Sequence, residues 1–182
     1  MDSTLNGKSI ILGITGGIAA YKSCDIVRKL VKQGANVNVI MTRSAQKFIT
    51  PLTFQILSQN QVYTDMFHYQ FDADVQHIEL ATNAQAILIA PATANTISKI
   101  AYGICDELLL SVVCATKAKV IFAPSMNTNM WENPIIQENI QKLKQSRYLF
   151  IEPEHGDLAC GYQGKGRLPD PEYIINYLKD II

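Results

Sequence analysis

The chain has 182 residues, which is enough for one compact domain with a full hydrophobic core. Sixteen Lys and Arg residues balance sixteen Asp and Glu residues, so no net field would attract nucleic acid or an anionic membrane. No apolar run reaches the roughly 18–20 residues that a membrane span needs, and the first seven residues carry no apolar signal core. We therefore expect a single domain over residues 1–182, located in the cytoplasm, without nucleic-acid or membrane partners.

Short apolar runs alternate with segments of helical periodicity along the whole chain. The runs that predict strands lie at residues 9–14, 35–41, 62–64, 86–90, 119–123 and 148–151. The segments with helical patterns lie at residues 20–31, 42–59 with an interruption at Pro51, 93–116 with a break near Gly103, 133–145 and 171–181. This alternation predicts an α/β fold, Rossmann-like and doubly wound, with a parallel sheet between two helical layers. In such a sheet ligands bind beyond the carboxyl ends of the strands, so chemistry is expected there.

The first strand ends in a glycine turn, Thr15-Gly16-Gly17-Ile18, before a helix. Such a turn lets backbone N–H groups face an anion at the positive end of the helix, although many such turns are only tight connections. The spacing is not Gly-x-Gly-x-x-Gly, and the second strand ends in Thr42-Arg43 with no Asp or Glu to hold a ribose hydroxyl. Both features count against NAD, and a single phosphate, as in FMN, suits the turn better.

The third strand ends in the segment Pro91-Ala92-Thr93-Ala94-Asn95-Thr96. Its small residues would let a flat ligand approach, while the threonines and the asparagine offer hydroxyl and amide groups. A helix N-cap explains one such polar residue, but not three of them beside two alanines. The segment is therefore a candidate ligand site.

The fourth strand leads into a segment that ends at Trp131, the only tryptophan of the chain. A polar loop with Met and Trp packed beneath it is the simpler interpretation. However, Met126, Asn127 and Met130 lie within six residues of sequence together with Trp131 and a second asparagine. This concentration favours the wall of a pocket.

A Gly-rich segment at about residues 155–168 predicts an irregular, mobile flap after the last strand. It carries Cys160, Lys165 and Arg167, and a thiol, an ammonium and a guanidinium suit an anionic substrate that needs a proton donor. The four cysteines match no zinc spacing, so we expect free thiols and no metal site. Those outside the flap lie in apolar stretches and are expected to be buried; they are Cys24, Cys105 and Cys114.

Together, these motifs resemble those of the homo-oligomeric flavin-containing cysteine decarboxylases. That family includes enzymes that act on phosphopantothenoylcysteine and lantibiotic enzymes that act on peptide C-termini. The resemblance covers about residues 8–178, and its most specific segments are Pro91–Thr96 and the Pro-x-Met-Asn-x-x-Met-Trp pattern at Pro124–Trp131. The family usually has Ser at the position of Thr93, a difference that keeps the hydroxyl. The remaining segments that carry the resemblance are Gly16–Lys22 and Ala159–Arg167.

The resemblance implies a role for each matching position. The residues expected to hold FMN are Gly17, Ile18, Thr42, Thr93, Ala94, Asn95 and Thr96. The residues expected to contact the substrate are Met126, Asn127, Met130, Lys165 and Arg167. On pattern alone His77 would be structural, as most lone histidines are, but it matches the active-site histidine of the family. Asn127 matches the asparagine that holds the substrate carboxylate, and Cys160 matches the flap cysteine that supplies a proton late in the cycle.

The same resemblance implies an activity, an assembly and a set of alternatives. We expect FMN-dependent decarboxylation of the cysteine moiety of 4′-phosphopantothenoylcysteine to 4′-phosphopantetheine in coenzyme A biosynthesis. The assembly would be a homotrimer or homododecamer in which His77 could serve the flavin of a neighbour. The alternatives are an oxidative decarboxylase of a peptide C-terminal cysteine, an NADP reductase that uses Arg43, and a regulatory subunit without catalysis. The chain could be a separate enzyme or one half of a bifunctional protein.

Overall fold

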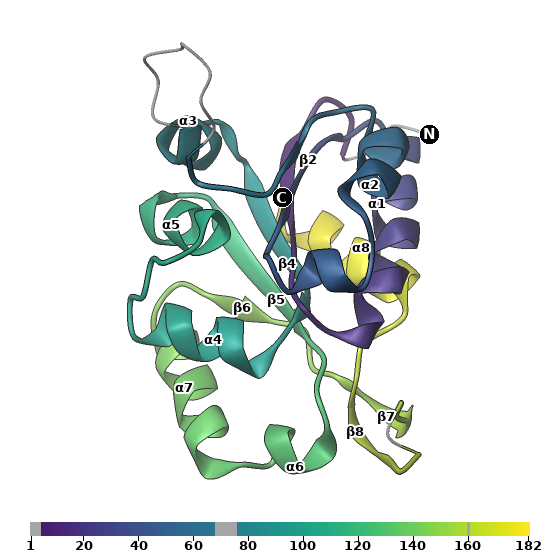
Figure 1. Cartoon of the computed structure of the whole chain (residues 1–182), viewed down its shortest axis with the longest axis vertical. Coiled ribbons are helices and arrows are strands. Elements are labelled where there is room, and N and C mark those ends of the chain that lie inside the picture. Colours follow the sequence, from purple (N-terminus) through teal and green to yellow (C-terminus); the bar gives the residue numbers. More distant parts are fainter. Residues whose placement is uncertain (1–4, 68–75, 160) are drawn as a thin grey trace.

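A parallel sheet forms the centre of the molecule (Figure 1). Within residues 5–67, 76–159 and 161–182, which the computed structural model describes, six strands join it in the order β3-β2-β1-β4-β5-β6, all parallel. The strands of this sheet are β1 Ser9–Ile14, β2 Asn36–Met41, β3 Val62–Tyr63, β4 Ala86–Ala92, β5 Lys119–Pro124 and β6 Leu149–Phe150. The order runs outward in both directions from the centre, which confirms the predicted doubly wound, Rossmann-like α/β fold.

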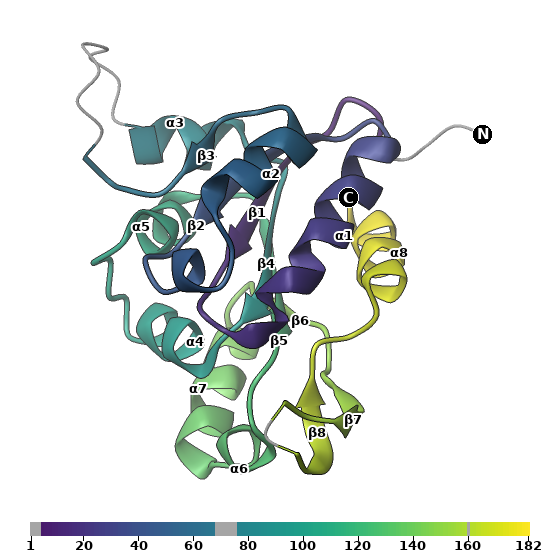
Figure 2. The same cartoon turned by 45° about the vertical axis from the view of Figure 1, so that its right-hand side comes forward.

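Two helical layers cover the sheet (Figures 1 and 2). The layer on one face consists of α1 Ser23–Lys32, α2 Pro51–Ser58 and α8 Pro171–Ile181. The layer on the other face consists of α3 Gln76–Asn83, α4 Ala94–Ala101, α5 Leu108–Ala115 and α7 Pro134–Gln145. Every residue of β4 is buried, because a central parallel strand is covered on both faces. None of the helices in the described residues is long and apolar enough to cross a membrane.

Short helices complete the chain, and several boundaries differ from the predicted ones. Two 3-10 turns, η1 Ile18–Lys22 and η2 Ala45–Lys47, follow β1 and β2. Pro51 separates η2 from α2, as predicted, by forming the first turn of α2. The strand predicted at residues 86–90 is longer than expected, because β4 continues through Pro91 to Ala92. The short helix α6 Thr128–Trp131 was not predicted.

The segment at 155–168 is not an irregular loop. It forms an antiparallel hairpin of β7 Glu154–Asp157 and β8 Gln163–Arg167, which projects from the carboxyl edge of the sheet (Figure 2). Few apolar residues alternate in this segment, so the sequence pattern of a strand is absent. The prediction that the cysteines outside the flap are buried is wrong for Cys105 and Cys114, which are exposed, while Cys24 is half-buried. Cys160 lies outside the described residues.

Candidate active site

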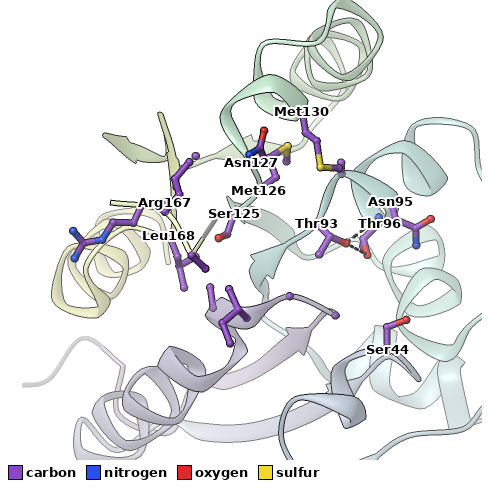
Figure 3. A pocket seen from close by; sticks show the side chains of 18 of the residues that line it. Ser44, Thr93, Asn95, Thr96, Ser125, Met126, Asn127, Met130, Arg167 and Leu168 are labelled. Carbon is purple, nitrogen blue, oxygen red and sulfur yellow. Dashed lines mark hydrogen bonds between the residues drawn. The ribbon is translucent and has the colours of Figure 1, made fainter. Parts of the chain in front are cut away.

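A cavity of about 980 Å³ opens at the carboxyl edge of the sheet, where the predicted strand ends converge (Figure 3). Its volume is in the range of cofactor and substrate pockets. One side, which we call the fixed wall, is formed by the turn at Gly16 and Gly17 and by the first turn of α4. The other side, which we call the hairpin wall, is formed by the hairpin β7–β8 together with Met126 and Asn127.

The fixed wall begins with a close contact at Gly16. A Cβ at Gly16 would lie 2.3 Å from Ser44 Cβ and 2.9 Å from the Ser44 carbonyl carbon, so only glycine lets the two turns approach. Thr15, which is buried, joins this turn to β4: its hydroxyl donates to Pro91 O at 2.7 Å and accepts from the Thr93 N–H at 3.1 Å. The ends of β1 and β4 are thereby held in fixed register.

The first turn of α4 places hydroxyl and amide groups on the same wall. Thr93 is the N-cap, and its Oγ1 accepts from the Thr96 N–H at 3.4 Å and lies 3.1 Å from Thr96 Oγ1. Ala94 and Asn95 also line the cavity, so the positive end of this helix faces it. Hydroxyl groups at the start of a helix form a suitable site for a phosphate.

The segment after β5 brings Asn127 to the opposite side. Asn127 caps α6, and its Oδ1 accepts from the Asn129 N–H at 2.8 Å. The neighbouring methionines, Met126 and Met130, supply apolar surface to the same side of the cavity (Figure 3). The sequence therefore places a polar amide between two adaptable apolar side chains.

The hairpin packs against this segment through its glycines. The Met126 N–H donates to Gly166 O at 2.9 Å, and a Cβ at Gly166 would lie 2.1 Å from Met126 O. A Cβ at Gly164 would lie 2.1 Å from Thr128 Oγ1. Close approach of the hairpin to the backbone of Met126 and to the side chain of Thr128, rather than mobility alone, accounts for these two glycines of the flap segment.

Most of the predicted site residues line the cavity. They are Gly17, Ile18, Thr42, Thr93, Ala94, Asn95, Thr96, Met126, Asn127, Met130 and Arg167. The guanidinium of Arg167 points away from the cavity in Figure 3. His77 and Lys165 are not among the lining residues: His77 lies in α3, at the end of the molecule opposite the hairpin (Figure 1), and Lys165 forms an ion pair with Glu152. The predicted proton donor Cys160 falls outside the described residues.

Sequence reasoning missed several lining residues. Ser44 and Ser125 follow β2 and β5, so the strand-end argument that selected Thr42 and Asn127 would also have found them. Lys22 also lines the cavity and donates to Leu168 O at 3.3 Å. Burial, and then the nearby charge of Arg167, lower the pKa of Lys22. Lys22 ends the segment Gly16–Lys22 that carried the resemblance, but its helical pattern alone gave no sign of the cavity.

Comparison with known proteins identifies the family. The sequence profile described as Flavoprotein matches residues 1–182. The chain belongs to this flavoprotein family. It is 51% identical over 171 residues to the coenzyme A biosynthesis bifunctional protein CoaBC of Bacillus subtilis, covering 94% of this chain but only 42% of that protein. It is 45% identical over 175 residues to a probable phosphopantothenoylcysteine decarboxylase of Streptococcus mutans, covering 95% of this chain and 98% of that one.

Solved structures of this flavoprotein family share the fold. A cysteine-to-serine mutant of a PPC decarboxylase, complexed with pantothenoylaminoethenethiol, aligns with a TM-score of 0.87 at 30% identity, over 96% of this chain and 97% of the other. The FMN binding protein AtHal3 aligns with a TM-score of 0.84 at 30% identity, over 96% of both chains. In the described part of this chain, no group of three or more His, Cys, Asp and Glu side chains is arranged to hold a metal ion.

Proposed function

We propose that the chain binds FMN in the cavity and decarboxylates the cysteine moiety of 4′-phosphopantothenoylcysteine, giving 4′-phosphopantetheine in coenzyme A biosynthesis. The observation that carries this proposal is the meeting of the hydroxyl-rich fixed wall with Asn127 and the hairpin in one cavity. The Streptococcus mutans relative, which the chain covers almost completely, supports the substrate. We also propose that residues 1–182 act as a single domain whose hairpin is the flap.

The fixed wall fits a flavin mononucleotide in its chemistry. Gly17, Thr42, Thr93, Asn95 and Thr96 would hold the phosphate and the ribityl hydroxyls with backbone N–H, hydroxyl and amide groups. The neighbouring apolar surface of Ile18, Ala94 and the methionines would face the flat ring. When bound, FMN would supply the two-electron oxidation of the cysteine Cβ–S unit and the later return of those electrons.

The hairpin wall would act on the substrate. Asn127 would orient the carboxylate, because its amide Nδ2 is a hydrogen-bond donor at the wall opposite the flavin site. Loss of CO2 then leaves an enethiolate, and Cys160 on the flap would donate a proton to its carbon. Proton transfers of this kind contribute about 10²–10⁴-fold to a rate.

His77 would assist proton removal at the start, from a second copy of the chain. Two observations support this: His77 does not line the cavity of its own chain, and Ile18 and Tyr21 at the cavity are 58% and 59% exposed. A neighbouring chain would cover these side chains and bring its own α3 to the cavity. We therefore propose a homo-oligomer, a trimer or four trimers together.

The test is anaerobic incubation of the flavin-loaded protein with 4′-phosphopantothenoylcysteine, without added reductant, followed by mass spectrometry. We expect loss of CO2 and formation of 4′-phosphopantetheine, whereas the Cys160→Ser variant should yield a product two hydrogens short. A peptide ending in cysteine serves as the competing substrate. Turnover of the peptide alone would overturn the coenzyme A assignment while leaving the flavin site intact.

A further inference from the structure

Lys165 lies between the two glycines that pack the hairpin against the Asn127 segment, yet it does not line the cavity. Its Nζ lies 2.8 Å from Glu152 Oε2 and 5.4 Å from the centroid of the Trp131 ring. Both distances are those of direct electrostatic contacts, the first an ion pair and the second a cation–π contact. The Lys165 ammonium therefore binds side chains of the protein and does not face the cavity.

Both partners of Lys165 are anchored outside the hairpin. Trp131 is 6% exposed and belongs to the buried core on the side of α4 and α7, and its backbone N–H donates to the backbone O of Asn127 at 2.9 Å. The second oxygen of Glu152, Oε1, lies 3.0 Å from Lys144 Nζ on α7. Partial burial would raise the pKa of Glu152, but hydrogen bonds from Lys165 and Lys144 outweigh it and lower this pKa, which keeps the carboxylate charged.

From these contacts we infer that Lys165 is a positioning residue, which latches the hairpin onto Trp131 and Glu152 and so sets the place of the hairpin wall relative to Asn127. The latch is weak enough to open, because the side chains of Lys165 and Glu152 are 44% and 53% exposed and water screens the pair. An opening hairpin would let substrate in, and a latched hairpin would cover it. Only the effect on turnover rests on the proposed function; the effect on the hairpin does not.

Hydrogen exchange of the backbone in residues 154–167, measured by mass spectrometry on the FMN-loaded protein, tests the latch. Lys165→Met keeps the length of the side chain without its charge, and Glu152→Gln keeps the shape of the acceptor. Lys165→Met removes both contacts and should raise exchange in the hairpin by about three- to tenfold, whereas Glu152→Gln removes only the ion pair and should raise it by about two- to fivefold. Lys165→Arg should restore wild-type exchange. Lys29→Met, which breaks an ion pair of similar exposure with Glu172 that has no part in the hairpin, is the matched control and should leave exchange unchanged.

Fluorescence of Trp131 gives a second, independent readout, because it is the only tryptophan of the chain. Glu152→Gln leaves the ammonium of Lys165 in place, so its emission should move toward that of Lys165→Met only if the hairpin has opened. Unchanged exchange and unchanged Glu152→Gln emission would overturn the latch. A raised KM in Lys165→Met with wild-type behaviour of Glu152→Gln would instead identify Lys165 as a substrate contact, which also overturns it. If wild-type protein lacks decarboxylase activity, the proposed function fails while exchange and emission still decide the latch.

Discussion

The fixed wall of the cavity rests on the buried sheet, whereas the hairpin wall, in the residues that the structure describes, is held by its ends, by polar contacts and by the packing of Gly164 and Gly166 against the segment after β5. Thr15 ties β1 to β4 from a buried position, and β4 itself is buried throughout. Ile151 and Leu168, which flank the hairpin on either side, are only 1% exposed. Within the hairpin, the residues of β7 alternate between half-buried and exposed. A wall of the first kind suits a resident cofactor, and a wall of the second kind suits a substrate that must enter and leave.

Changing the amide of Asn127 breaks the hairpin wall chemically without moving it. Asp is as good an N-cap as Asn, so Asn127→Asp should keep α6 intact, but its carboxylate would repel the substrate carboxylate. We expect decarboxylation to fall at least about 100-fold, a typical loss when a charge-stabilising donor is removed. Bound FMN and the melting temperature should match those of wild type.

Asn133→Asp makes the same change at the N-cap of α7, where Asn133 Oδ1 accepts from the Ile135 N–H at 3.0 Å. This control should retain full activity. Equal losses in the two variants would contradict a role of Asn127 in the substrate site.

Changing Gly16 breaks the fixed wall mechanically. The Cβ of Gly16→Ala would press against the Ser44 backbone, which cannot rotate away, so the variant should lose about 1–3 kcal/mol of unfolding free energy and most of its bound FMN. A Cβ at Gly17 would lie 3.7 Å from Thr93 Cγ2, an ordinary contact, so Gly17→Ala should melt like wild type. Thermal unfolding measures the stability of the two variants, and flavin absorbance measures their bound FMN. Similar melting temperatures of Gly16→Ala and Gly17→Ala would refute the close contact at Gly16.

Thr93→Val sharpens the account of the fixed wall with a smaller change. It removes the hydroxyl that caps α4 but keeps the volume of the side chain. We expect a loss of about 1 kcal/mol of stability and about tenfold weaker FMN binding. Calorimetry of unfolding and flavin titration would detect these effects. Unaltered flavin affinity would remove Thr93 from the proposed phosphate site.

The sequence allowed the fixed wall to be predicted far better than the hairpin wall. Continuous apolar runs identified β1, β4 and β5, and the polar residues that follow them were already the candidate site. The hairpin escaped because its strands alternate glycine with polar residues, and those glycines pack closely against Met126 and Thr128, contacts that no periodicity records. Helix α3 was missed for a related reason, since among its residues 77–83 only Leu80 and Ala81 are buried.

Acid should loosen the hairpin wall before the fixed wall, and this is the smallest effect. The pKa of Glu152 is lower in the folded protein than in the unfolded chain, where a glutamate has a pKa of about 4.3. The carboxylate therefore stabilises the hairpin fully above that unfolded pKa, and this stabilisation is lost as the pH falls through the lower pKa of the folded protein. Trp131 emission should therefore change below about pH 4.3 in wild type. Glu152→Gln should lack this transition, and a transition common to both proteins would show that another group causes it.

The division of roles between the two walls is tested most directly by measuring bound FMN and product on the same sample of Gly166→Ala. The added Cβ would collide with Met126 O, and the φ of Gly166, 144°, is strained for any other residue, so the hairpin must shift. The account predicts wild-type flavin content, with formation of 4′-phosphopantetheine from 4′-phosphopantothenoylcysteine reduced at least about tenfold. Loss of the flavin together with activity, or full activity with the hairpin displaced, would contradict it.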